Sequence, residues 1–237
     1  MIYLPILSTL VTFAFATAVF RRYQAKGGWH LALWAFGLLL YGLGTLSEAI
    51  LSFTFSIWVL KLWYLTGAML TAAWLGQGSV HLLVRRGRIA LTLTGILGAL
   101  SLLALIFVAL MGVESTAPTY NTALEASLQY KDILVRSGIV IFLTVFLNLY
   151  GTLTLVGGAL YSAFLFWRKQ VLFNRMMGNL LIAGGALLPA LAGSLLKAGT
   201  LDVLYLSELF GVAIMFAGFW LATADRPVKV GTAVKAV

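Results

Sequence analysis

Apolar residues form seven long runs along this chain, and short polar links separate most of them. A helix needs roughly 20 mainly apolar residues to cross a bilayer, where every backbone N–H and C=O must be satisfied within the segment. The sequence therefore predicts an all-α integral membrane protein, a seven-transmembrane helix bundle over residues 1–225 with a short tail over 226–237. The predicted spans are about 2–20, 29–53, 56–84, 89–112, 137–167, 172–197 and 201–223.

The link between the fourth and fifth predicted spans is the long one. Thr122 and Glu125 have the spacing of a capping box, and Leu124, Leu128 and Ile133 follow as an apolar stripe. This pattern predicts a short amphipathic helix over about 121–135, lying on the outer surface of the bundle. Such a helix either packs over the bundle or acts as a lid or a docking element for a partner.

Composition agrees with a membrane protein and leaves little room for anything else. The chain is 62% apolar and 10% charged, whereas soluble domains average about 45–50% and about 25%. The first apolar run has no basic segment before it and no small-residue cleavage site after it, so it is interpreted as a retained span and not a signal peptide. Seven spans leave no space for a soluble catalytic domain.

The charged residues behind the net charge of +9 are distributed unevenly between the links of the two membrane sides. Twelve of the sixteen basic residues follow the odd-numbered spans, while most acidic residues of the links lie on the other side. By the positive-inside rule the N-terminus is outside and the C-terminus is cytoplasmic, in the plasma membrane of a prokaryote. This charge indicates a membrane surface and not nucleic acid as the partner. The twelve are Arg21, Arg22, Lys26, Arg85, Arg86, Arg88, Arg168, Lys169, Arg175, Arg226, Lys229 and Lys235.

A faint internal repeat relates the two halves of the chain. A shift of 147 positions places Arg21 on Arg168 and Gly37 on Gly184, and a shift of 144 places Gly67 on Gly211. The repeat predicts a 3+1+3 plan in which two triplets of helices share one orientation and the fourth span links them.

Charged residues inside the predicted spans are the candidates for function. Charges are costly in lipid, so they should face the bundle interior or a wet cavity, although lysines near a helix end can also reach water by extending along it. At least one of Glu48 and Glu208 is expected to point into the bundle and pair with a lysine or a hydroxyl, forming the floor of an outward-facing polar pocket. The candidate ligand-binding residues are Glu48, Lys61, Trp63, Tyr64, Lys197 and Glu208.

No pattern of catalytic residues accompanies these candidates. The chain has no cysteine and two histidines, His30 and His81, which are interpreted as interfacial residues. The last span has no lysine for a retinal Schiff base. We therefore predict no enzyme activity, no metal and no cofactor.

The stretch 28–88 combines a Leu-Trp-rich helix, a Lys-Leu-x-Tyr-Leu-x-Gly pattern and a basic link. It resembles the first half of the seven-helix sensor modules fused to bacterial histidine kinases and diguanylate cyclases. The resemblance covers about a quarter of the chain and implies a receptor-like fold without its own output domain, so that any signal would pass to a separate partner. The residues of the pattern are Lys61, Leu62, Tyr64, Leu65 and Gly67.

Three functions are left open by the sequence. The first is a receptor-like or partner-regulating module that binds a small apolar or amphipathic ligand in its outer half and signals to a membrane protein partner. The second is a small-solute transporter, since sugar-efflux carriers share the 3+1+3 plan. The third is a non-catalytic subunit of a larger membrane complex.

Overall fold

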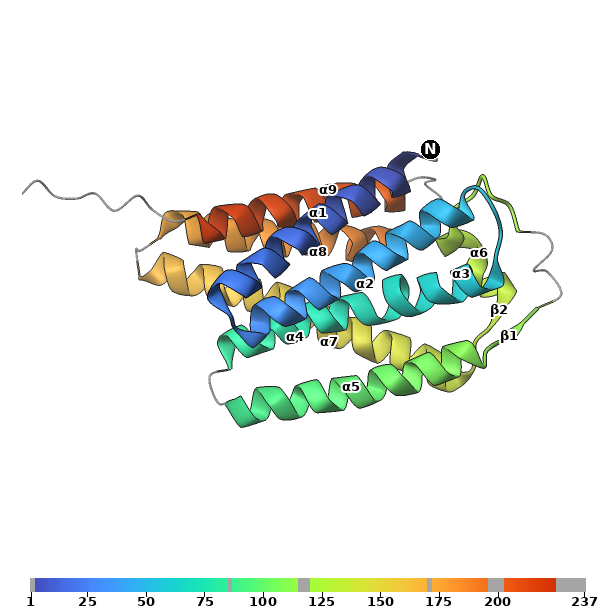
Figure 1. Cartoon of the computed structure of the whole chain (residues 1–237), viewed down its shortest axis with the longest axis horizontal. Coiled ribbons are helices and arrows are strands. Elements are labelled where there is room, and N and C mark those ends of the chain that lie inside the picture. Colours follow the sequence, from blue (N-terminus) through green and yellow to red (C-terminus); the bar gives the residue numbers. More distant parts are fainter. Residues whose placement is uncertain (1–2, 85–86, 115–119, 170–171, 196–202, 225–237) are drawn as a thin grey trace, which may run out of the picture.

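Six long apolar helices dominate the computed structural model, which describes residues 3–84, 87–114, 120–169, 172–195 and 203–224 (Figure 1). Each of the six is long and apolar enough to cross a membrane. The chain is thus a multi-pass, all-α membrane protein, as its sequence predicts. The six helices are α1 (Tyr3–Lys26), α2 (Trp29–Leu51), α5 (Gly87–Ala109), α7 (Gly138–Arg168), α8 (Phe173–Leu195) and α9 (Val203–Thr223).

The segment predicted as the third span is built from three helical pieces that follow one another along one line (Figure 1). These pieces are α3 (Ile57–Trp63), η1 (Tyr64–Leu70) and α4 (Thr71–Leu83). The middle piece is a π-helix, in which each N–H bonds five residues back and not four. At its end both the backbone N–H and the hydroxyl of Thr71 donate to the carbonyl of Thr66, the latter at 2.7 Å.

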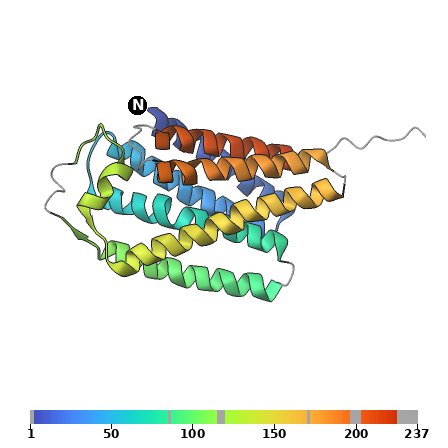
Figure 2. The ribbon, with the colours of Figure 1, turned by 180° about the vertical axis from the view of Figure 1, so that it is seen from behind.

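The helices form a ring in which each packs against the next. The order around the ring is α1, α2, the α3–η1–α4 rod, α7, α8 and α9, and α9 closes it by packing against α1 (Figure 2). Helix α5 stands outside the ring against α4, η1 and α7. Its other faces expose large apolar side chains such as Leu91 and Leu102, as expected of a helix that faces lipid.

Small residues bring helices of the ring into backbone contact. On α8 and α9, a Cβ added at Gly185 would lie 2.6 Å from the carbonyl oxygen of Gly211, and one at Gly218 would lie 2.6 Å from that of Gly178. Close approach through glycine is a common way for membrane helices to associate. Helix α8 continues through Pro189, which has no N–H to donate to the preceding turn.

The long link between α5 and α7 covers one end of the bundle, called the α6 end below (Figure 1). It contains α6 (Ala126–Ile133) and a short antiparallel pair, β1 (Gly112–Val113) and β2 (Leu134–Val135). The helix expected over about 121–135 is therefore present but shorter. Its N-cap residue is Glu125, without a side-chain capping bond, because the preceding residues form a turn in which Asn121 Oδ1 accepts from the N–H of Ala123.

Candidate functional site: a cavity with a buried carboxyl pair

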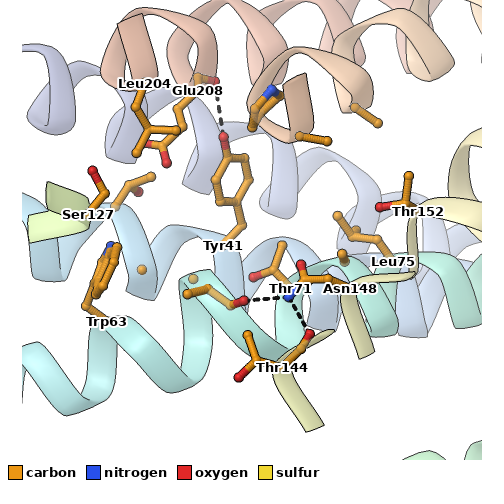
Figure 3. Close-up of a pocket in the computed structure, with 18 of the residues that line it drawn as sticks. Tyr41, Trp63, Thr71, Leu75, Ser127, Thr144, Asn148, Thr152, Leu204 and Glu208 are labelled. Atoms are coloured by element: carbon orange, nitrogen blue, oxygen red, sulfur yellow. Dashed lines mark hydrogen bonds between the residues drawn. The ribbon is translucent and has the colours of Figure 1, made fainter. Parts of the chain in front are cut away.

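A cavity of about 780 Å³ lies inside the ring, beneath α6 (Figure 3). Its size falls within the roughly 300–1,000 Å³ of typical small-molecule sites. Helix α2, the α3–η1–α4 rod, α6, α7, α8 and α9 all contribute side chains. The space is therefore enclosed by both halves of the chain.

The charged side chains of this cavity gather at one end, while the rest of its lining is mixed. Glu208 lies near the α6 end, whereas Leu75 lies further along the bundle beside Thr71, Asn148 and Thr152 (Figure 3). Glu48 also lines the cavity. A molecule with one charged end and a mainly apolar remainder matches this lining better than a uniformly polar solute does.

Two glutamates from opposite sides of the ring meet at the polar end. Glu48 on α2 is 1% exposed, and its Oε1 accepts a hydrogen bond of 2.6 Å from Trp63 Nε1. The carboxyl groups of Glu48 and Glu208 lie within hydrogen-bonding reach of each other. Within the described part of the chain, no N–H or O–H group donates to Oε2 of either residue. A proton or a cation must therefore lie between the two carboxyl groups.

The position of Glu208 is fixed from α2 as well as from its own helix. The hydroxyl of Tyr41 donates to the backbone carbonyl of Glu208 at 3.2 Å (Figure 3). Tyr41, Thr45 and Glu48 recur at intervals of four and three residues, which places them on one face of α2. That face, with Gly44, forms one wall of the cavity.

The π-helix forms the adjoining wall. A Cβ added at Gly44 would lie 2.7 Å from the Cα of Gly67, so α2 and η1 touch through their backbones at this point. On the other side of η1, Asn148 Nδ2 of α7 donates to the carbonyl oxygen of Ala68 at 2.7 Å (Figure 3). The π-helix is therefore held between α2 and α7, and Trp63 at its start reaches Glu48.

Aromatic rings close the cavity at the α6 end. Tyr130 of α6 packs edge-on against Trp63, with ring centroids 5.4 Å apart, and Arg136 lies over the Tyr130 ring at 5.1 Å. In the link outside the spans, Tyr120 stacks on Phe55 at 4.7 Å. Burial raises the pKa of Tyr120 to about 12, and burial also raises the pKa of Tyr130.

Three of the six predicted site residues, Glu48, Trp63 and Glu208, come together in this cavity. Tyr64 lies behind its wall, where its hydroxyl bonds Thr144 Oγ1 at 2.9 Å. Lys197 falls outside the described residues.

Lys61 lies elsewhere and has a different role. Its Nζ donates to the carbonyl oxygen of Ala109 at 2.9 Å and sits 5.0 Å from the centre of the Trp58 ring. A lysine in this position satisfies the last carbonyl of α5 and complements the negative end of that helix. Lys61 forms no ion pair with Glu48 or Glu208.

The expected pairing of a glutamate with a hydroxyl is also wrong for Ser47, Thr66 and Ser207. Ser47 and Thr66 donate to the backbone carbonyl four residues earlier in their own helices, and Ser207 donates to the one three residues earlier. Such local bonds are always available to a helical serine or threonine. The glutamates have each other and Trp63 as partners.

Sequence reasoning missed Tyr41 and Thr45 as lining residues. The available signal was their spacing from Glu48, which marks a polar stripe on an otherwise apolar helix. No protein-family model, curated protein or solved structure was found to match the chain.

Proposed function

We propose that this protein is a receptor-like seven-helix membrane protein that binds a small amphipathic ligand in the cavity and passes its occupancy to a separate partner protein. The observation that carries this proposal is a ligand-sized cavity, lined by side chains from both halves of the chain, with the carboxyl pair of Glu48 and Glu208 at one end. The resemblance of residues 28–88 to bacterial sensor modules supports the same function.

The proposed topology has seven spans, with α3, η1 and α4 together forming the third. The links between successive spans alternate between the two ends of the bundle (Figure 1). The basic residues Arg21, Arg88 and Arg168 belong to one end, which by the positive-inside rule is cytoplasmic. The cavity then opens toward the outer half of the membrane, beneath α6.

A 3+1+3 plan is supported by the order of packing around the ring. Helix α1 packs on α2 and α2 on the α3–η1–α4 rod, as α7 packs on α8 and α8 on α9, with α5 left over. The correspondence holds for helices and not for single residues. Gly67 touches Gly44, while its counterpart Gly211 touches Gly185, which aligns with Leu38.

In the proposed signalling mechanism, one ligand contacts both triplets of helices at the same time. A ligand that bridges α2 and α9 at the carboxyl pair would bias their relative position, and ligands shift a protein between states only through such differential contacts. Helices α8 and α9, which meet through glycines, would carry the change toward the cytoplasmic end.

Binding is tested with the full-length protein in nanodiscs, by following tryptophan fluorescence as single-chain amphiphiles are added. We expect saturable binding that is lost when Ala186, which lines the cavity, is replaced by Phe to fill the space. Parent-like binding by a folded Ala186→Phe variant would refute the cavity as the site. Saturable uptake of a bound solute into proteoliposomes would favour the transporter over the receptor.

Topology is tested with peptide tags in intact cells. A tag before Met1 should be accessible from outside, and a tag after Val237 should be protected until the membrane is opened. Accessibility of the C-terminal tag in intact cells would overturn the orientation.

A further inference from the structure

We infer that the ligand of this cavity is a primary amine on an apolar tail, bound as its ammonium ion between Glu48 and Glu208. The inference rests on the proposed function and names the chemical class of the ligand.

The first argument is charge. Two carboxyl groups in contact within a helix bundle need a proton or a cation beside them, because ionised carboxylates repel each other most strongly where the dielectric constant is low. A shared proton meets this need in the empty cavity, and a cationic ligand can take its place. The described part of the chain offers the pair no cationic side chain, since Lys61 is bound to the end of α5. Lys131 also lines the cavity, but it is exposed and its Nζ lies over the Tyr130 ring at 5.9 Å.

The second argument is hydrogen bonding. Oε1 of Glu48 is occupied by Trp63, and the hydroxyl of Tyr41 is occupied by a backbone carbonyl. What remains at the carboxyl pair itself is acceptor capacity, on Oε2 of Glu48 and of Glu208. A primary ammonium has three donors and no acceptor, so it can satisfy both oxygens at once. A carboxylate or phosphate ligand would place acceptor against acceptor.

The third argument is the remainder of the cavity. A bare metal ion would fill only a small part of about 780 Å³, and hard cations prefer a shell of oxygens to apolar walls. Leu75, Leu155 and Met215 offer an apolar surface to a tail. An alkyl chain there would gain roughly 0.8 kcal/mol of transfer free energy for each CH₂ group that leaves water.

The cavity also reaches the side of the bundle. Two of its lining residues, Val145 and Leu149 of α7, are 61% and 58% exposed, so they face outward as well as inward. Helices α7 and α8 lie close together at their linked ends and diverge toward the α6 end (Figure 2). A tail therefore has a path from the bilayer between α7 and α8, while the ammonium meets the carboxyl pair.

The experiment compares three probes of one chain length, decylamine, decanol and decanoate, in phosphatidylcholine nanodiscs at neutral pH. Affinities are expressed relative to the concentration of each probe in the lipid, measured on empty nanodiscs. We expect decylamine to bind at least about tenfold more tightly than decanol, the effect of one charge-assisted hydrogen bond, and decanoate to bind most weakly. The preference for decylamine should shrink to a few-fold or less in Glu208→Gln and Glu48→Gln. It should persist in the control Glu114→Gln, which alters an exposed glutamate of the link.

Failure of the inference and failure of the proposed function give different results. Equal binding of the three probes, or a preference for decanoate, would overturn the amine and leave the cavity as a binding site. Protection against heat by sodium ions, with no preference for decylamine, would overturn it in favour of a metal cation. Absence of binding by all three probes would count against the proposed function itself. The probe series on the parent protein decides the matter even if the glutamine variants do not fold.

A second set of nanodiscs identifies the source of the amine. If phosphatidylethanolamine in the discs competes with decylamine, the natural ligand is a lipid headgroup. If it does not, the ligand is a free amine.

Discussion

Two buried polar clusters lie at different depths of the same bundle, and they differ in whether their hydrogen bonds are complete. Away from the α6 end, Gln77 is 0% exposed and uses both ends of its amide. Its Nε2 donates to Thr94 Oγ1 at 2.8 Å and to the carbonyl of Ala90 at 3.0 Å, and its Oε1 accepts from Tyr150. At the α6 end, the carboxyl pair borders a cavity, and each member has an oxygen without a protein donor.

The difference indicates that the Gln77 cluster stabilises the bundle, whereas the carboxyl pair is suited to bind a ligand. Gln77 joins α4 to α5 and α7, and side-chain hydrogen bonds of this kind hold membrane helices together. Glu48 and Glu208 leave acceptor capacity unused beside open space, which a stable core does not do without a reason. An ionisable group inside a membrane is by default a candidate functional site.

The largest contrast should come from adding methyl groups at a close contact between helices and, for comparison, at the cavity. A Cβ at Gly218 would lie 2.6 Å from the carbonyl oxygen of Gly178, a backbone atom that cannot rotate away. We expect Gly218→Ala to lower the free energy of unfolding by about 1–3 kcal/mol, as overpacking does. Gly184→Ala, which meets nothing within 4 Å, is the matched control. Thermal melts in detergent measure both.

The same experiment at the cavity should have the opposite result. Ala186→Val places its extra methyl groups toward open space, so its melting temperature should stay close to that of the parent. A loss as large as that of Gly218→Ala would mean that the cavity closes in the membrane, and the comparison between the two regions would fail.

A smaller difference in stability is expected when one polar side chain of each cluster is replaced. Gln77→Leu removes the acceptor of the Tyr150 hydroxyl and one of the two side-chain donors to the Ala90 carbonyl, which should lower the free energy of unfolding by about 1–2 kcal/mol. Glu208→Gln should change it by less than about 0.5 kcal/mol, because an amide N–H of Gln can replace the proton shared by the two carboxyl groups. Chemical denaturation in mixed micelles measures both. If the two variants rank in the reverse order, the carboxyl pair is the structural cluster.

The smallest effect concerns the links at the α6 end under alkaline conditions. Burial raises the pKa of Tyr120 from its ordinary value of 10.0 to about 12, so the folded protein holds this proton more tightly than the unfolded chain does. The contribution to stability is present below about pH 10 and is lost as pH rises toward 12. Tyrosinate absorbance should show one fewer late-titrating group in Tyr120→Phe. Loss of a group that titrates near the ordinary pKa of 10.0 instead of a late-titrating one would place Tyr120 in water.

The parts of this fold that depend on local pattern were predictable from sequence. Apolar runs located the long helices, and the cost of charge in lipid identified Glu48 and Glu208 as candidates to face the bundle interior. The sequence predicted a lysine or a hydroxyl as their partner, and not each other. Lys61 was misplaced because a lysine at that depth can reach several partners, and only the position of the end of α5 decides among them. The start of α6 was misplaced because Asn121 competes with Thr122 for the local turn.

The shape of the cavity lay beyond sequence analysis because it depends on how helices diverge. Val145 and Leu149 look like ordinary lipid-facing residues of α7 until the path of α8 is known. Tyr41 is more instructive, because its spacing from Glu48 was visible in the sequence but was not used.

The π-helix at residues 64–70 has a consequence for the ancestry of the chain. A π turn contains one residue more than the α-helical turn it replaces, so removing one residue from this segment would restore a regular α-helix. That deletion would leave α3 and α4 close to their present relative orientation, because the wide turn absorbs its extra residue locally. A shorter precursor with an uninterrupted third rod would therefore still have presented the indole of Trp63 to the carboxyl pair. The extra residue within 64–70 could thus have been gained without loss of the site.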